Sequence, residues 1–197
     1  MFRKILLSAA LALICLSVIA QSDTLLFYKG SIKTNNTGMY VLASWAVLNL
    51  ATGAYGWKNG SGGNKYFHQM NLFWNTVNMS IATYALANNY LTDYHLLTGE
   101  QLYQKHLTFE KLYLINAGLD VVYMGVGLGL RTISFKNEKR KDMLYGYGNS
   151  IILQGGFLFA FDAVMYLIQH HARMEFLREM NLGLNLGMNT FGIYLNL

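Results

Sequence analysis

Four long apolar segments constrain this chain more than any other feature of its sequence. They cover residues 39–56, 66–90, 107–130 and 146–170. Each is close to the length of about 20 residues that an α-helix needs to cross the hydrocarbon core of a bilayer. Only helices and closed barrels satisfy their backbone inside lipid, and these segments lack the alternation and frequent turns of barrel strands. We therefore expect an all-α protein, built as a four-helix transmembrane bundle.

The composition agrees with a surface that faces lipid. Hydrophobic residues make up 53% of the 197 residues and charged residues only 13%, whereas a soluble domain has about 25% charged residues. Proline is absent, so proline kinks are not expected in the helices. The formal net charge of +5 is small and its cations are scattered, which gives no electrostatic footprint for nucleic acid.

Residues 1–20 have the pattern of a cleavable signal peptide. Arg3 and Lys4 precede an apolar run, and Ala20 precedes a suitable cut before Gln21. The alternative is an uncleaved fifth membrane helix, although the apolar run is shorter than a usual span. Cys15, the only cysteine, lies in this leader. The mature chain is therefore expected to have no disulfide and no thiolate metal site.

The charges of the connectors predict an orientation. The connectors after the first and third segments are basic, whereas the connector 91–106 has Lys105 as its only Lys or Arg. Because basic loops stay in the cytoplasm, we expect a multi-pass protein of the inner (cytoplasmic) membrane with both mature termini outside the cytoplasm. The expected divisions are the signal peptide 1–20, an extracytoplasmic segment 21–38, the transmembrane domain 39–170 and an extracytoplasmic tail 171–197.

The end of the tail alternates large apolar residues with glycine and asparagine. The period of two begins at Leu182 and continues through Met188, then resumes after a shift of one residue. Such alternation predicts extended structure. We expect a short extended segment or hairpin over the outer face. The alternative, a lone barrel-like strand, has no sibling strands in the sequence.

Polar residues recur at spacings of three and four within the apolar segments, which places them on one face of each helix. Lipid offers no hydrogen bonds, so these faces are expected to point inward and form a polar seam. The candidate site residues of the seam are His68, Asn71, Asn75, Asn78, Glu110, Asn116, Asp120, Gln154 and Asp162.

Counting the helical rise predicts that Asn78, Asp120 and Asp162 lie at similar depths and meet in one layer. A carboxyl group there costs at least ~2.5 kcal/mol on insertion scales. Two interpretations stay open. The acids hydrogen-bond the nearby amides and fix the packing, or they form a ligand or proton site.

Other chemistry has less support in the sequence. His95, His106, His170 and His171 fall outside the cytoplasm in the expected orientation, but the Glu-x-x-His spacing of a di-iron bundle is absent. We expect no metal site, and no cofactor is indicated. Ser44 has no recognisable base partner. The sequence leaves enzymatic activity uncertain and favours a protein without it.

Several short motifs resemble a family of uncharacterised small bacterial membrane proteins. The motifs lie between Gly38 and His170 and include Trp74-Asn75, Asn116-Ala117-Gly118-Leu119-Asp120, Gln154-Gly155-Gly156-Phe157 and Phe161-Asp162. The resemblance implies a helical membrane domain of unknown function, with the polar seam as its distinguishing feature. It implies no activity and no residue roles.

Two functional hypotheses follow. The first is a non-enzymatic membrane bundle that binds a partner, a lipid or a small ligand through its polar seam or its tail. The second is a membrane-embedded enzyme or proton-coupled carrier that uses Asp120 and Asp162. The expected partners are membrane lipids and either another protein or a second copy of the chain, with no nucleic acid.

Overall fold

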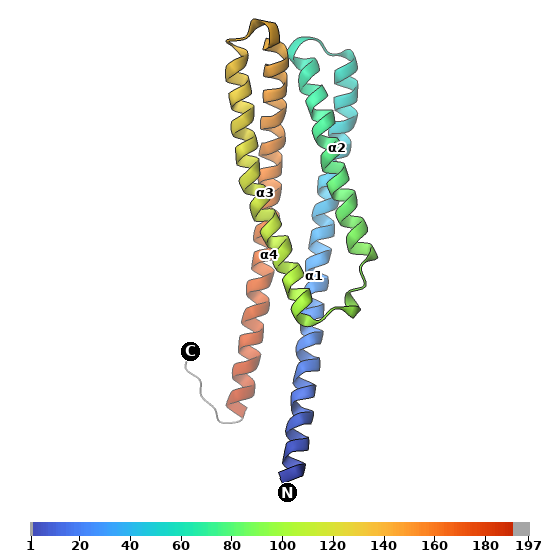
Figure 1. The fold of residues 1–197 in the computed structure, drawn as a ribbon, viewed down its shortest axis with the longest axis vertical. Helices are drawn as coiled ribbons and strands as arrows, with labels where there is room; N and C mark the ends of the chain where they lie inside the picture. Colours follow the sequence, from blue (N-terminus) through green and yellow to red (C-terminus); the bar gives the residue numbers. More distant parts are fainter. Residues whose placement is uncertain (1, 191–197) are drawn as a thin grey trace.

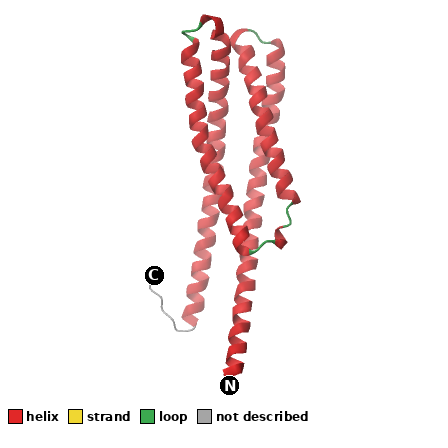
Figure 2. Cartoon of the chain, in the orientation of Figure 1, coloured by secondary structure: helices red, strands yellow, loops and turns green. Residues whose placement is uncertain are grey.

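The computed structural model describes the backbone of residues 2–190 and the side chains of residues 23–180. It has four long helices, α1 (Phe2–Asn59), α2 (Gly62–Leu91), α3 (Gly99–Ser134) and α4 (Lys141–Thr190). Two 3-10 helices, η1 (Tyr94–Leu96) and η2 (Glu138–Arg140), lie in the connectors. No strand occurs in the described chain (Figure 2). The expected all-α class is confirmed, and each of the four apolar segments lies within one helix.

The helices form two hairpins that pack side by side (Figure 1). One hairpin is α1 with α2 and the other is α3 with α4, and α2 also packs against α4. The α1–α2 and α3–α4 connectors share one end of the bundle, while the longer α2–α3 connector lies nearer the opposite end. Each residue layer of the bundle can therefore draw side chains from helices that are distant in sequence.

The connectors carry recognisable helix signals. Thr98 and Gln101 form a capping box at the start of α3, with the Gln101 amide donating to Thr98 Oγ1 at 3.3 Å and the Thr98 amide donating to Gln101 Oε1 at 2.9 Å. Gly62 has a φ of 54°, a left-handed conformation that glycine adopts without strain, and this allows the tight turn between α1 and α2.

Glycine allows α3 and α4 to approach closely near the end of the bundle that carries the short connectors. A Cβ atom built on Gly127 would lie 2.7 Å from the carbonyl oxygen of Gly148 and 2.8 Å from Cγ1 of Ile152. Neither backbone can retreat without disturbing its helix. The crossing therefore requires glycine on α3 at this point, as is common between tightly packed membrane helices.

The structure differs from the expectation for the tail. Residues 181–190 continue α4 as helix, so the predicted extended segment or hairpin is wrong for this stretch. A helix satisfies its own backbone hydrogen bonds, whereas an isolated strand needs a partner strand. The rest of that prediction, on residues 191–197, lies outside the described residues.

The start of the chain is also more continuous than the expected division implies. Helix α1 passes without a break through the predicted cleavage site after Ala20 and through the segment 21–38. Tyr28, Ser31, Ile32 and Asn35 of this segment are buried within the bundle. The segment thus contributes to the core, and cleavage of the leader stays a prediction.

The buried interior of the bundle contains more polar residues than apolar ones. Among the described side chains, sixteen buried residues are polar or charged and thirteen are apolar, while thirty large apolar residues are exposed. Two helical stretches, Gly99–Ser134 and Glu138–Met180, are long and apolar enough to cross a membrane. The helices therefore have polar side chains between them and apolar side chains around them.

Candidate functional site

The polar seam resolves into three clusters, of which the first is formed by amides. We call Trp45, Asn49, Asn71, Ser150 and Gln154 the amide cluster. Gln154 and Ser150 are fully buried, each at 0% exposure. These residues come from α1, α2 and α4, so the cluster joins three of the four helices.

Hydrogen bonds within the amide cluster match donors with acceptors. Asn71 Oδ1 accepts from Ser150 Oγ at 2.8 Å and from Gln154 Nε2 at 2.9 Å. Asn71 Nδ2 donates to Asn49 Oδ1 at 3.0 Å. Trp45 Nε1 donates to Gln154 Oε1 at 2.9 Å. A satisfied network of this kind fixes the relative positions of the helices, because moving any of them strands a buried polar group.

Asn75 and Asn78 extend the amide cluster along α2. Asn75 Nδ2 donates to the carbonyl oxygen of Asn71 at 2.8 Å, and Asn78 Nδ2 donates to Asn75 Oδ1 at 3.3 Å. Both asparagines are buried. Their hydrogen bonds run within α2, and the described contacts include no hydrogen bond from Asn78 to Asp120 or Asp162. Hydrogen bonds therefore do not join Asn78 to the two acids of the predicted layer, and the common depth of the three residues stays a prediction.

The second cluster is the carboxyl pair, Asp120 of α3 and Asp162 of α4. The two side chains are 3% and 5% exposed and lie close enough to influence each other across the contact of α3 with α4. A hydrogen bond between two carboxyl groups needs a proton on one of them, because an ionised carboxylate only accepts. Asp120 Oδ2 is buried and has no hydrogen-bond partner in the described part of the chain.

Apolar side chains flank Asp162 along α4. Leu158 and Met165 lie one turn before and one turn after Asp162, and both belong to a buried apolar cluster with Met39 and Leu42 of α1. Tyr113 belongs to the same buried cluster, and its hydroxyl donates a hydrogen bond to Asn35 Oδ1 at 3.1 Å. The pair thus lies in an environment that favours its neutral, proton-sharing form.

The third cluster is a histidine network of Ser31, His106, Glu110, Gln169 and Arg173. His106 is fully buried, with Nδ1 at 2.8 Å from Ser31 Oγ and Nε2 at 3.1 Å from Glu110 Oε1. Arg173 Nε donates to Glu110 Oε1 at 2.8 Å. The buried Glu110 carboxylate is therefore compensated by a cation and by an imidazole N–H.

The Ser31 hydroxyl links the histidine network to α4. It lies 3.1 Å from Gln169 Oε1, and Gln169 Nε2 donates to the Ser31 carbonyl oxygen at 3.0 Å. One hydroxyl hydrogen faces two buried acceptors, Gln169 Oε1 and His106 Nδ1. When it serves Gln169, His106 must carry hydrogens on both nitrogens to satisfy Ser31 and Glu110. Burial lowers the pKa of His106, so the neutral imidazole, which accepts the Ser31 hydrogen at Nδ1, is the favoured arrangement.

Sequence reasoning missed most of the histidine network. The sequence pattern places Glu110 in the seam, but it presents His106 only as one of several histidines expected outside the cytoplasm. The signal was present, since His106 and Glu110 are four residues apart and so share a helix face. Ser31 and Gln169 become partners only through the packing of α1 against α4, which no local pattern reveals.

Two of the predicted seam residues lie apart from these clusters. Asn116 is exposed on α3. His68 is half-buried, with its ring against Gly56 at the α1–α2 crossing, and its Nδ1 atom is buried without a hydrogen-bond partner among the described residues. The remaining seven predicted residues, Asn71, Asn75, Asn78, Glu110, Asp120, Gln154 and Asp162, are buried.

Metal ligands do not converge in the part of the chain whose side chains are described. No group of three or more His, Cys, Asp or Glu residues there is arranged to hold a metal ion. Glu110 forms hydrogen bonds or ion pairs with His106, His170 and Arg173.

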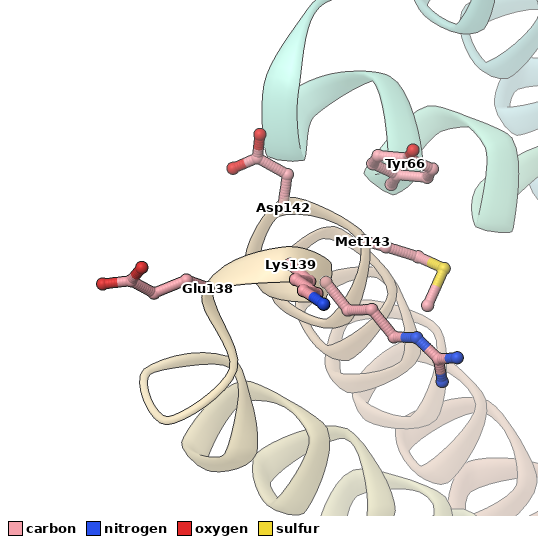
Figure 3. A pocket seen from close by; sticks show the side chains of 6 residues that line it. Tyr66, Glu138, Lys139, Asp142 and Met143 are labelled. Carbon is pink, nitrogen blue, oxygen red and sulfur yellow. The ribbon is translucent and has the colours of Figure 1, made fainter.

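A pocket of about 460 Å³ lies at the end of the bundle that carries the short connectors (Figure 3). It is lined by Tyr66 of α2, by Asp142 and Met143 of α4 and by the three residues of η2, which are Glu138, Lys139 and Arg140. This pocket is separate from the polar seam.

Comparison with known proteins gives a family and no activity. Residues 41–163 match the model of a family of unknown function, DUF6992. No curated protein and no solved structure matches the chain significantly. The matched region contains the amide cluster and the carboxyl pair, and it covers more than half of the chain. The chain therefore belongs to the DUF6992 family of unknown function.

Proposed function

We propose that this chain is a multi-pass protein of the inner membrane whose four helices cross the bilayer as a bundle. The observation that carries the proposal is the inverted distribution of side chains. Exposed positions between the bundle ends are uncharged and mostly apolar, whereas amides, carboxyls and a histidine are buried between helices. Water favours the opposite arrangement, and soluble proteins rarely expose apolar patches of this extent.

The charges of the chain leave a belt free for lipid. Across 39–56, 66–90, 112–130 and 146–169 the only Asp, Glu, Lys or Arg residues are Asp120 and Asp162, and both are buried. The remaining charges lie toward the two ends of the bundle. A lipid-facing surface needs this separation, because an unpaired charge in hydrocarbon is costly.

The ends of the bundle differ in charge, which supports an orientation. The end that carries the short connectors, here called the basic end, has seven cations against Glu138 and Asp142. The cations are Lys58, Lys65, Arg131, Lys136, Lys139, Arg140 and Lys141. Basic connectors remain on the cytoplasmic side, so the proposal places both mature termini outside the cytoplasm, as a cleaved signal peptide also requires.

Within this membrane bundle, the proposed role is the non-enzymatic binding of a lipid, a small ligand or a protein partner. The satisfied hydrogen bonds of the amide cluster support a structural role for that part of the seam. They hold α1, α2 and α4 in place, as polar side chains do between membrane helices. Partners of the proposal are membrane lipids and another protein or a second copy, and nucleic acid is not among them.

A second candidate function rests on the carboxyl pair. Asp120 Oδ2 is buried and accepts no hydrogen bond from a donor group among the described residues, and Asp162 lies beside Asp120, so the two carboxyl groups can hold a proton between them. This observation favours a proton-coupled carrier or a membrane-embedded enzyme. In that case Asp120 and Asp162 would bind the proton or the substrate directly.

Alkaline carbonate extraction of membranes tests the main proposal. We expect the chain to stay in the membrane pellet at high pH and to enter solution only with detergent, because apolar belts hold proteins in bilayers independently of charge. The Asp120→Asn and Asp162→Asn variants should behave identically. Release of the chain into the carbonate supernatant would contradict the membrane assignment.

A further inference from the structure

We infer that the pocket at the basic end binds the headgroup of an anionic phospholipid from the cytoplasmic leaflet. The inference rests on the proposed membrane function and names a lipid class and a site for it. The pocket lies between the first turns of α2 and α4, beside η2. In the proposed orientation this is where the headgroups of the cytoplasmic leaflet lie.

The first argument is charge that has no partner within the protein. The ion pairs of the described residues involve Glu110 or Glu175, which lie toward the opposite end of the bundle. Lys139 and Arg140 line the pocket, and neither forms an ion pair among the described residues. Cations held near the leaflet surface attract anionic lipids.

The second argument is the placement of the two acids that also line the pocket. In Figure 3 the carboxylates of Glu138 and Asp142 project away from the side on which Met143 and Tyr66 lie. Asp142 Oδ2 lies 3.4 Å from the position of a Cβ atom built on Gly62, at the first turn of α2. The Ser61 side chain makes no capping hydrogen bond there. Asp142 therefore complements the positive end of α2, and among the described residues it forms no ion pair with Lys139 or Arg140.

The third argument is the mixed chemistry of the lining. A thioether and an aromatic ring, from Met143 and Tyr66, accompany an ammonium and a guanidinium group. Arginine and lysine are the side chains that recognise phosphate, whereas tyrosine and methionine pack against apolar chains. A phospholipid presents both parts, a phosphate and the start of its acyl chains, while a free phosphate would use only the cations.

Lipid binding by the purified chain in neutral detergent tests the inference. Native mass spectrometry would measure the affinity for phosphatidylglycerol, for phosphatidylcholine and for glycerol phosphate, which carries a phosphate group without acyl chains. We expect phosphatidylglycerol to bind and the other two to bind much more weakly. The variant Lys139→Gln with Arg140→Gln should bind it about 30-fold more weakly, at roughly fivefold for each cation.

Two further variants make the test specific to the pocket. Lys58→Gln with Lys65→Gln removes the same charge from the same end of the bundle, outside the pocket lining, and should change the affinity by less than about threefold, because solvent screens these lysines from a lipid held in the pocket. Lys139→Arg with Arg140→Lys keeps the charge and should retain binding. Circular dichroism would check that each variant is as helical as the parent chain.

Other outcomes overturn the inference. Equal losses in the two Gln variants would assign the binding to general charge, and tight binding of glycerol phosphate would assign the pocket to a free anion. The membrane proposal has its own readout in carbonate extraction. A chain that stays in the pellet but binds phosphatidylglycerol independently of Lys139 and Arg140 contradicts only this inference.

Discussion

At the scale of single residues, the buried acids are the positions at which a packing role and a functional role can be told apart by substitution. Two carboxyl groups that share a proton cost less to bury than two charges, so the carboxyl pair is compatible with a stable bundle. The amide cluster has no comparable spare capacity, because its donors meet acceptors within the cluster. The carboxyl pair is therefore the part of the seam in which substitution separates the two proposed functions.

Asp120→Asn and Asp162→Asn should each leave the protein folded, with a loss of thermal stability in detergent below about 1 kcal/mol. The amide keeps most of the hydrogen bonding that the carboxyl group provides. Asp120→Leu should cost more, about 1–3 kcal/mol, because it leaves Asp162 buried without its partner. Thermal unfolding in detergent is the measurement.

Asn116→Leu is the matched control for these variants, since Asn116 is a polar residue on the exposed side of α3. It should unfold at the same temperature as the parent chain. If either Asp→Asn variant instead loses its fold, the acids serve packing, and the carrier or enzyme hypothesis loses its supporting observation.

At the scale of the elements, sequence patterns were a good guide to helices and a poor guide to their partners. The four apolar segments and the inward polar faces followed from spacing alone, and seven of the nine seam residues are buried. The pairing of Trp45 with Gln154 or Ser31 with His106 depends on how helices cross. Local periodicity contains no information on that geometry.

The tail explains why a period of two was misleading. Leu182, Leu184 and Leu186 alternate with glycine and asparagine, yet residues 181–190 extend α4. Helix propagation adds one hydrogen bond for each residue ordered, whereas a strand needs a neighbour to pair with. The alternation predicted a strand, but the described chain contains no second strand with which it could pair.

The crossing of α3 and α4 gives a prediction at this scale. Gly127→Ala should lower stability by about 1–3 kcal/mol, because its Cβ atom would overlap the Gly148 carbonyl oxygen and force the helices apart. Thermal unfolding in detergent measures the effect.

Gly125→Ala is the matched control, because a Cβ atom there meets nothing within 4 Å. It should leave stability unchanged or raise it slightly, since alanine favours helix over glycine. Equal effects of the two substitutions would show that helix propensity, and not the close approach, governs this part of α3.

At the scale of the whole molecule, one organisation accounts for the separate observations. Polar side chains lie between the helices, apolar side chains lie around them, and most charges lie at the ends. Membership of a family of unknown function adds no activity to this description. The central claim is therefore physical, namely that the belt of exposed apolar residues is covered by lipid.

Labelling of single cysteines with a membrane-impermeant maleimide tests this claim most directly. In a Cys15→Ser background, Asp93→Cys should react in intact spheroplasts and Lys136→Cys only after the membrane is opened. Val122→Cys, within the exposed apolar belt of α3, should react only after detergent removes the lipid. Ready labelling of Val122→Cys in intact membranes would contradict the account.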